Sequence, residues 1–338
     1  MNLSESLLVE VSRGSMVESV HLMDAVVVTA DGDIIAAWGD VEHEIYARSS
    51  AKPLQALPLI ETGAADHFGF SDAEIALACA SHQSQAIHVN TATAIVERIG
   101  LSESNLECGP HWPYNLKSAG ELARSGQRPT RFHNNCSGKH SGFLATAVHM
   151  GEAPEGYIQP DHPVQQRITE TMSEMTGWDL DNTARGVDGC GIPVIGMPLA
   201  ALARGMARMA DPRGLGAVRE NAAQRIVSAM CAHPKMVSGS GKVDTVGMAA
   251  LENVALKGGA EGVHIAILPE RGMGVALKTR DGNGRASDAA ILWILNYLGV
   301  IGTRAAEELA DYLEPPVKNT LGNTVGHIST RESGGNDG

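Results

Sequence analysis

Strand-like segments lie near both ends of this 338-residue chain, and the long stretch between them has a helical pattern. Apolar, β-branched runs predict strands at 5–12, 25–30, 33–38, 262–268 and 274–279. The second and third runs are joined by Asp31-Gly32, a typical hairpin turn. Because an isolated two-stranded hairpin is only marginally stable in water, the strands from the two ends are expected to pair in one sheet.

Helical periodicity fills the region between these terminal strands. Helices are expected at 50–62, 72–79, 85–99, 115–124, 138–149, 161–176, 197–209 and 216–230, followed by 285–298 and 303–312. This order predicts an α/β (α+β) fold. Its antiparallel sheet is built from N- and C-terminal strands and flanked by helices, with a helical middle region beside it.

The chain contains no Pro/Gly/Ser-rich linker, so residues 1–330 are expected to form a single catalytic unit. The sheet region is expected to comprise about 1–50 and 245–315, and the helical region about 51–244. The polar end of the chain begins near Thr330, and residues 331–338 are expected to be a disordered tail.

The composition indicates a globular protein with a sizeable core, since 43% of residues are hydrophobic and 19% are charged. A formal net charge of −13 argues against nucleic acid or an anionic membrane as a partner. An apolar run of about 18 residues and a basic, signal-like start are both missing, so a cytoplasmic protein without a membrane partner is expected. The five cysteines are too irregularly spaced for a disulfide framework.

The segment Arg48-Ser49-Ser50-Ala51-Lys52-Pro53 follows a strand-like run and begins a helical one. Ser49 and Lys52 are three residues apart, so a helix would place the hydroxyl and the amine on one face. A neutral lysine within hydrogen-bonding reach can take the proton of a serine and make it a nucleophile. The spacing is short and common, and a capping serine with a surface lysine is the alternative interpretation.

Two further segments raise the case for a serine hydrolase. They are Ser81-His82-Gln83, after a predicted helix, and Lys257-Gly258-Gly259, directly ahead of a predicted strand. The order Ser-x-x-Lys, Ser-x-Gln, Lys-x-Gly resembles the three-element site of penicillin-binding proteins and serine β-lactamases. Gln83 and Gly258 depart from that pattern. A related fold with two serine–lysine pairs is therefore predicted, rather than the same substrate.

Two polar, Gly-rich segments each present one cysteine, Cys136 in the first and Cys190 in the second. Two thiolates, one nitrogen ligand and an open position make a credible zinc site. Lys139 is a candidate for the nitrogen ligand, although its amine must be neutral, and His133 and His140 are the ordinary alternatives. Buried structural cysteines, or a nucleophilic Cys136, are the interpretations without a metal.

Longer segments make the resemblance to a known family specific. They are RSSAKPLQALPLIETGAAD, ACASHQSQAIHV, CGPHWP, HNNCSGKHSGFLATAVHMG, YIQPDHPVQQRI, GVDGCGIPVIGMPLAALARGMA and KGGAEGV. Together they resemble the Rhizobium etli-type L-asparaginases, which are distinct from the bacterial threonine-dependent enzymes and from the plant-type enzymes. The similarity runs from about residue 6 to about residue 315 and so covers nearly the whole chain.

This resemblance implies hydrolysis of L-asparagine to L-aspartate and ammonia by a homodimer with a serine β-lactamase/glutaminase-like fold. The implied site consists of Ser49 with Lys52, Ser81 with Lys257, the zinc ligands Cys136, Lys139 and Cys190, and Asp188 beside metal and substrate. The Lys-Gly-Gly-Ala-Glu-Gly sequence around Lys257 varies slightly from the family pattern.

In the expected mechanism, Lys52 activates Ser49, which forms an acyl-enzyme that water then hydrolyses. Ser81 and Lys257 relay protons, and backbone N–H groups near Ser49 form an oxyanion hole. Arg48 is a candidate partner for the α-carboxylate of the substrate, with a surface salt bridge as the alternative. Zinc is expected to orient the substrate rather than to generate hydroxide.

Two other functions stay open. One is another β-lactamase-like serine amidohydrolase, a glutaminase or cyclic amidase, and the other is a metal or redox sensor that uses Cys136 and Cys190. Gly239-Ser240-Gly241-Lys242 contains part of a phosphate-binding loop, but Met236 and Val243 occupy the remaining positions of that pattern. Nucleotide binding is therefore rejected.

Overall fold

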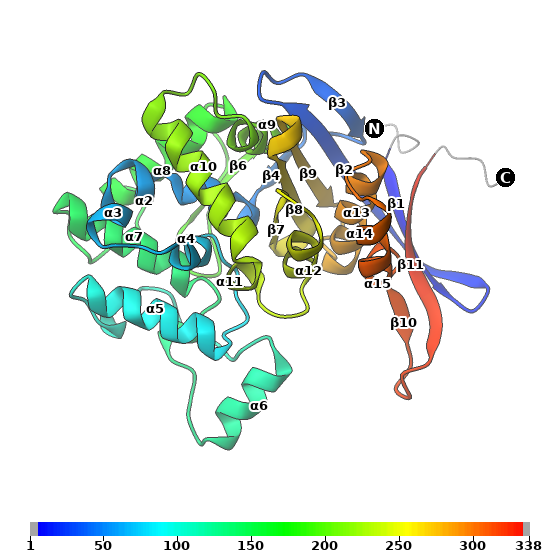
Figure 1. Ribbon diagram of the computed structural model, residues 1–338, viewed down its shortest axis with the longest axis horizontal. Helices are drawn as coiled ribbons and strands as arrows, with labels where there is room; N and C mark the ends of the chain where they lie inside the picture. The colour runs from blue at the N-terminus through cyan, green and yellow to red at the C-terminus, as the bar shows by residue number, and fades with distance from the viewer. Residues whose placement is uncertain (1–5, 334–338) are drawn as a thin grey trace.

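The computed structural model describes residues 6–333, and its main feature is an eight-stranded antiparallel sheet (Figure 1). The strand order is β10-β11-β1-β2-β9-β8-β7, and β3 also pairs with β2. The strands are β1 (Leu7–Arg13), β2 (Met16–Thr29), β3 (Ile34–Trp38), β7 (Ala255–Gly259), β8 (Val263–Leu268), β9 (Met273–Thr279), β10 (Pro316–Lys318) and β11 (Thr324–Glu332). The expected pairing of the two ends is confirmed, since β1 pairs with β11 and β2 with β9.

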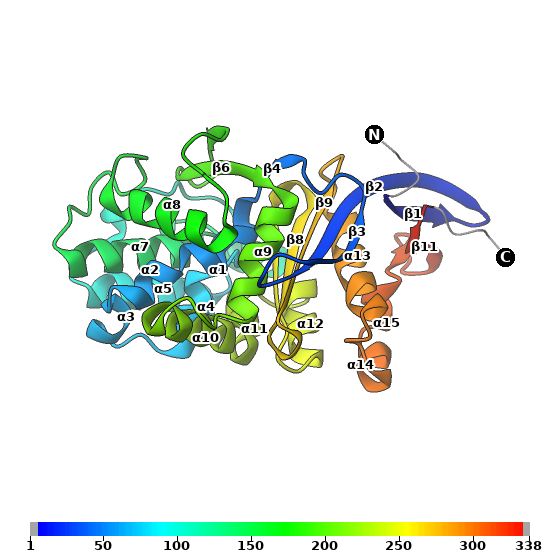
Figure 2. The same cartoon turned by 90° about the horizontal axis from the view of Figure 1, so that it is seen from above.

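Helices cover both faces of this sheet, which is why all six residues of β8 are buried. Helix α9 (Leu199–Ala210) packs on one face over β2, β8 and β9, and α13 (Gly284–Tyr297) packs on the other (Figure 2). Gly274 in β9 permits this contact, because a Cβ there would lie 2.2 Å from the carbonyl oxygen of Ala203 and 2.3 Å from the nitrogen of Ala207. The predicted fold class is therefore confirmed.

Most of the helical middle region lies beyond α9, on the side away from α13, whereas α12 (Val243–Ala250) lies beside the sheet on the α13 side (Figure 2). Its helices are α1 (Lys52–Gln55), α2 (Leu57–Glu61), α3 (Ala64–His67), α4 (Asp72–Ala78), α5 (Ala86–Arg98), α6 (Leu116–Arg124), α7 (Ser137–Met150), α8 (Pro163–Thr176), α10 (Ala217–Ala232), α11 (Pro234–Ser238) and α12 (Val243–Ala250). Each helix expected between residues 72 and 230 has a counterpart among α4–α10.

Two expected helices are broken. The one expected at 50–62 is a 3-10 helix, Arg48–Ala51, followed by α1 and α2. Pro53 and Pro58 lie in the first turns of α1 and α2, where the missing N–H of proline is tolerated and the preceding helix has to end. The helix expected at 303–312 is divided into α14 (Thr303–Glu308) and α15 (Ala310–Leu313).

Several strands were not predicted from the sequence. A second sheet has the order β4-β6-β5, with β4 (Glu44–Tyr46), β5 (Arg185–Val187) and β6 (Pro193–Pro198). The expectation of a disordered tail from Thr330 was wrong up to Glu332, because these residues belong to β11. That strand is polar at its end because it lies near the edge of the sheet, where solvent replaces the core. The rest of the expected tail, 334–338, lies outside the described residues.

Buried apolar side chains form one continuous core that runs from the sheet into the helical region. The division into a sheet region and a helical region within a single unit stays a prediction. Of the helices between residues 6 and 333, none has both the length and the apolar character needed to cross a bilayer.

Replacing Gly274 with alanine is expected to lower the free energy of unfolding by about 2–3 kcal/mol, because the added methyl group would overlap the backbone of α9. Urea denaturation measures this change. Gly302→Ala is the matched control, since a Cβ at Gly302 has no atom within 4 Å. A Gly274→Ala protein as stable as the wild type would contradict the direct packing of α9 on β9.

Candidate active site

A cavity of about 400 Å³ brings together residues from β7, from the start of the helical region and from α13. Ser49, Ser81 and Lys257, three of the four predicted catalytic residues, line this cavity. A cavity of about 500 Å³ beside the C-terminal ends of α12 and α13 contains none of the predicted site residues. The chemistry expected from the sequence is therefore concentrated in the first cavity.

Ser49 lies in the 3-10 helix that connects β4 to α1. The preceding residue, Arg48, has a φ of 51°, a left-handed conformation that is rare for residues with a side chain and is often found at functional sites. Gly259 of β7 packs against this turn, since a Cβ there would lie 3.0 Å from the nitrogen of Ser50 and 3.1 Å from the oxygen of Ala47. The strand thereby fixes the backbone that carries Ser49.

The amine of Lys52 is fully buried and points toward Ser81. It donates hydrogen bonds to the carbonyl of Ala80, to Ser81 Oγ at 3.0 Å and to Cys136 Sγ at 3.2 Å. Throughout residues 6–333, no hydrogen bond reaches the hydroxyl of Ser49. The contact expected between Ser49 and Lys52 is thus replaced by one between Lys52 and Ser81, which joins one residue of each predicted pair.

Lys257 precedes the predicted strand, which is β8, and itself lies in β7, a strand that was not predicted from the sequence. Its side chain is buried, and its amine donates to the carbonyl of Gly258 at 2.5 Å. Burial lowers the pKa of Lys257 to about 8. The carboxylate of Asp244 acts to raise this pKa, and the charge of Lys52 lowers it further. A lysine with this pKa is partly neutral near pH 7–8 and can accept a proton.

Asp244 is a residue of this site that the sequence analysis missed. It accepts hydrogen bonds from Ser238 Oγ at 2.6 Å and from the N–H of Gly258 at 3.1 Å, and lies 2.7 Å from His264 Nε2. Burial acts to raise the pKa of Asp244, but His264, Lys257 and the Ser238 hydroxyl hold it well below its ordinary value. Asp244 therefore anchors the strand of Lys257 as a carboxylate. These groups belong to α11, α12, β7 and β8, so no local spacing connects them.

The three expected zinc ligands, Cys136, Lys139 and Cys190, lie together next to Lys52, which donates a hydrogen bond to Cys136. Cys136 precedes α7, Lys139 lies in its first turn, and Cys190 lies between β5 and β6. The amine of Lys139 donates to Cys190 Sγ at 3.1 Å. A hydrogen bond from Cys136 lowers the pKa of Cys190 to about 5; burial acts in the opposite direction, and the charge of Lys139 lowers the pKa further. The same hydrogen bond, together with burial, raises the pKa of Cys136 to about 12.

The two histidines considered as alternative ligands have other partners. His133 Nδ1 lies 2.9 Å from the hydroxyl of Thr130, and His140 Nδ1 lies 2.6 Å from the hydroxyl of Tyr157. Lys139 is thus the nitrogen-bearing side chain in contact with Cys190.

Arg48 and Asp188, the expected substrate-binding residues, are paired with each other. Nε and Nη2 of Arg48 each lie 2.9 Å from Asp188 Oδ1. Both residues line a separate hollow of about 20 Å³. Burial acts to raise the pKa of Asp188, but Lys139 and Arg48 lower it overall. The charges of this pair are therefore largely satisfied within the protein.

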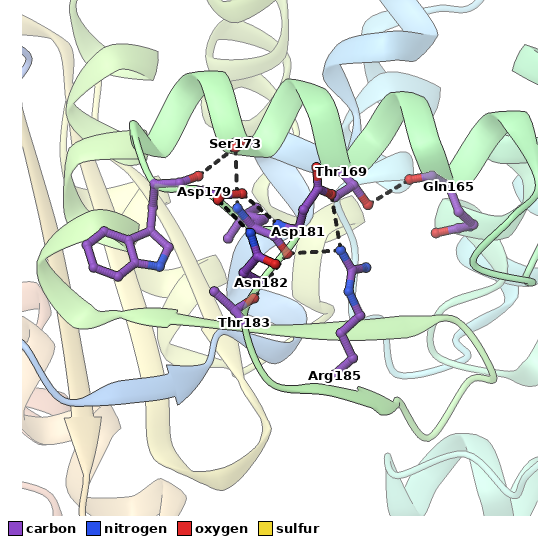
Figure 3. A network of polar contacts seen from close by, with 10 residues as sticks. Gln165, Thr169, Ser173, Asp179, Asp181, Asn182, Thr183 and Arg185 are labelled. Carbon is purple, nitrogen blue, oxygen red and sulfur yellow. Dashed lines mark hydrogen bonds and ion pairs between the residues drawn. The ribbon is translucent and has the colours of Figure 1, made fainter.

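A network of polar contacts holds the loop that leads from α8 to β5, and so to Asp188 and Cys190 (Figure 3). Ser173 Oγ donates to the carbonyl of Trp178 at 2.6 Å, and Arg185 donates to the carbonyl of Leu180 at 2.9 Å. These contacts secure both ends of the loop.

The family model described as L-asparaginase II matches residues 9–330 of this sequence. The chain belongs to the L-asparaginase II family. The family recognised from the sequence motifs is thus confirmed, and membership together with the serine-bearing cavity indicates a serine amidohydrolase. No curated protein matches the chain.

Three solved structures are similar to this family member at low identity. Mglu in its tris and glutamate form is 15% identical, with a TM-score of 0.45, over 82% of this chain and 59% of Mglu. EstCE1, a hydrolase with promiscuous acyltransferase activity, is 12% identical, with a TM-score of 0.41, over 78% of this chain and 90% of EstCE1. A beta-lactamase from Mycobacterium bovis is 14% identical, with a TM-score of 0.34, over 86% and 94%. Function therefore rests on the family and on the site geometry.

The donor set of this L-asparaginase II family member fits zinc in type. Cys136 and Cys190 offer two sulfurs that share a hydrogen bond, and Lys139 offers a nitrogen 3.1 Å from one of them. Across residues 6–333, no three His, Cys, Asp or Glu side chains group as a metal site, so an ion here requires the Lys139 amine. Zinc prefers this mixture of sulfur and nitrogen.

Lys257→Met is expected to change stability in a pH-dependent way. The pKa of Lys257 falls from 10.5 to about 8 on folding, so the buried charge costs stability below pH 8, and this cost disappears as the pH rises to 10.5. The stability of the variant relative to the wild type should therefore decrease by about 3 kcal/mol between pH 7 and pH 11. Urea denaturation at both pH values tests this, with the exposed Lys318→Met as control. A difference independent of pH would show that folding does not lower the pKa of Lys257.

Proposed function

We propose that this chain hydrolyses the side-chain amide of L-asparagine to L-aspartate and ammonia, with Ser49 as the nucleophile. The observation that carries this proposal is the shared cavity of Ser49, Ser81 and Lys257, with the buried Lys52 donating to Ser81 Oγ at 3.0 Å from behind the cavity wall. Two hydroxyls and two amines in one partly buried site provide a nucleophile and the groups that move its proton.

In the acylation step, the oxygen of Ser49 forms a bond with the amide carbon of the substrate. The proton of Ser49 passes into the group formed by Lys52, Ser81 and Lys257, and a proton from this group reaches the departing nitrogen. The C–N bond then breaks, ammonia leaves, and an ester remains on Ser49. Water cleaves the ester in the second step, which restores the serine and releases the acid.

Lys257 is suited to hold the exchanged proton, because its pKa of about 8 lies close to neutral pH. Asp244 raises this pKa against the effect of burial and binds the N–H of Gly258 at 3.1 Å. It thus both positions the strand of the lysine and limits the lowering of its pKa. Asp244 acts through Lys257 and Gly258 as a positioning residue.

The same proposal includes zinc, held by Cys136, Lys139 and Cys190. A bound zinc ion would supply a fixed positive charge beside Asp188 and would orient the substrate. The chain's own residues carry out the proton transfers described above. A homodimer in the cytoplasm that acts on a small amide completes the proposal.

Ser49→Ala is expected to reduce the turnover of L-asparagine by at least about a thousandfold without loss of the fold, since no other group would form the ester. Ammonia release measures turnover, and circular dichroism checks the fold. Ser104→Ala, an exposed serine outside the cavity, is the matched control. Near-full turnover by Ser49→Ala would eliminate Ser49 as the nucleophile. Faster ammonia release from glutamine than from L-asparagine would show that glutamine is the better substrate.

Purified protein is expected to contain about one zinc ion per chain, as measured by mass spectrometry of the metal content. Cys136→Ser and Cys190→Ser should each lower this content at least about tenfold, because each removes a sulfur ligand. Cys231→Ser, which lies away from the cluster, should leave it unchanged. Equal zinc in all four proteins would rule out these ligands.

A further inference from the structure

The Gly239-Ser240-Gly241-Lys242 segment, which the sequence analysis rejected as a nucleotide site, lies at the active-site cavity. Ser238, Lys242 and Val243 line the same cavity as Ser49 and Lys257. The segment connects α11 to α12, and Lys242 is the residue just before α12. It therefore brings a cation to a site where the sequence pattern alone gave it no role.

The Ser81-His82-Gln83 segment and the residues that follow it hold this loop in place. Gln83 Nε2 donates to the carbonyl of Ser240 at 3.0 Å, and the N–H of Ser240 donates to Gln85 Oε1 at 3.0 Å. Gly239 has a φ of 90°, and a Cβ there would lie only 3.0 Å from Gln85 Oε1. Gln83 and Gln85 thus hold the loop at Ser240 and Gly239, which positions the start of α12 relative to the segment that carries Ser81.

Two of the four charges that line the cavity are already satisfied. Asp244 accepts from Ser238 and Gly258 and lies 2.7 Å from His264. The buried amine of Lys257 donates to the carbonyl of Gly258.

The other two charges are less fully satisfied, although Lys242 and His264 both attract the carboxylate of Asp288. Lys242 is exposed, and its ammonium group makes no ion pair or hydrogen bond with any residue from 6 to 333. Asp288, in the first half of α13, lies 3.6 Å from His264 Nδ1, and its side chain is 46% exposed. The cavity of Ser49 therefore presents one cation and one anion to a ligand.

Arg48 does not supply this cation. Its guanidinium is paired with Asp188 at 2.9 Å, and both residues line a different hollow. Recognition of a carboxylate by Arg48 would require this half-buried pair to separate, which would remove one of the two cations, Arg48 and Lys139, that stabilise the charge of Asp188. Lys242 has no such cost.

We propose that Lys242 binds the α-carboxylate and Asp288 the α-ammonium group of an amino acid substrate whose side-chain amide reaches Ser49. The two residues thus select a zwitterionic α-amino acid over simple amides. This assignment rests on the proposed function, because it names what the same site recognises. Opposite charges on opposite ends of a ligand fix its orientation as well as its affinity, and each charged contact is directional.

Three amides separate the two contacts. L-asparagine carries both groups, 3-aminopropanamide lacks the carboxylate, and succinamic acid lacks the ammonium group. Lys242→Ala should raise KM at least about tenfold for L-asparagine and succinamic acid but leave 3-aminopropanamide unaffected. Asp288→Asn should do the same for L-asparagine and 3-aminopropanamide but leave succinamic acid unaffected. In both variants kcat should stay within about threefold of the wild type, and Lys242→Arg should restore KM.

Lys318→Ala, on the distant strand β10, is the control and should behave as the wild type on all amides. Equal losses on all three amides, or unchanged KM for L-asparagine in Lys242→Ala, would overturn the assignment while leaving the proposed function intact. If the wild type hydrolyses none of these amides, the proposed function fails. Calorimetric binding of L-aspartate then decides the assignment: weaker binding by Lys242→Ala and Asp288→Asn supports it, and equal or absent binding overturns it.

Discussion

Three lysine side chains are buried in the interior of this protein, and the arrangement around them depends on satisfying their amines. Lys52, Lys139 and Lys257 are among the largest fully buried side chains. An amine removed from water is costly unless it is hydrogen-bonded, paired or neutral. Lys52 donates hydrogen bonds to a carbonyl and a serine, and Lys139 donates one to Cys190, whose thiol has a low pKa. The pKa of Lys257 is lowered, so its amine is partly neutral. Each solution also produces a chemically reactive group.

These partners come from segments that are far apart in the sequence. Strand β7 carries Lys257 and packs, through Gly259, on the turn of Ser49. Helix α4 leads to Ser81, which meets Lys52. A bulky residue at Gly259 would push the strand away from the turn and separate the two halves of the site. Close backbone packing therefore keeps the serines and lysines within one cavity.

The sequence predicted what is periodic or local. Helices α4 to α10 follow the 3.6-residue pattern, and the terminal strands had to pair because neither hairpin is stable alone. Four site residues, Ser49, Lys52, Ser81 and Lys257, were predicted from short motifs and are gathered around one cavity by the fold. The resemblance to a family supplied the roles that the motifs alone left open.

What the sequence did not predict depends on contacts between distant elements. Lys52 turns to Ser81 instead of Ser49 because the carbonyl of Ala80 lies there to receive it. Asp244 and Lys242 belong to α12 and its start, which no spacing connects to β7. Strand β11 lacks apolar alternation because it pairs near the edge of the sheet, so its polar end looked like a tail.

The pairing of β1 with β11 also has a consequence for how the chain is made. About 300 residues separate the two strands, so at roughly 5–20 residues per second the ribosome takes about 15–60 s to supply the partner of β1. During that time β1 can pair with β2 but not yet with β11. Until β11 is made, the nascent chain therefore presents one edge of β1 without its partner strand, and such an edge can pair with another chain.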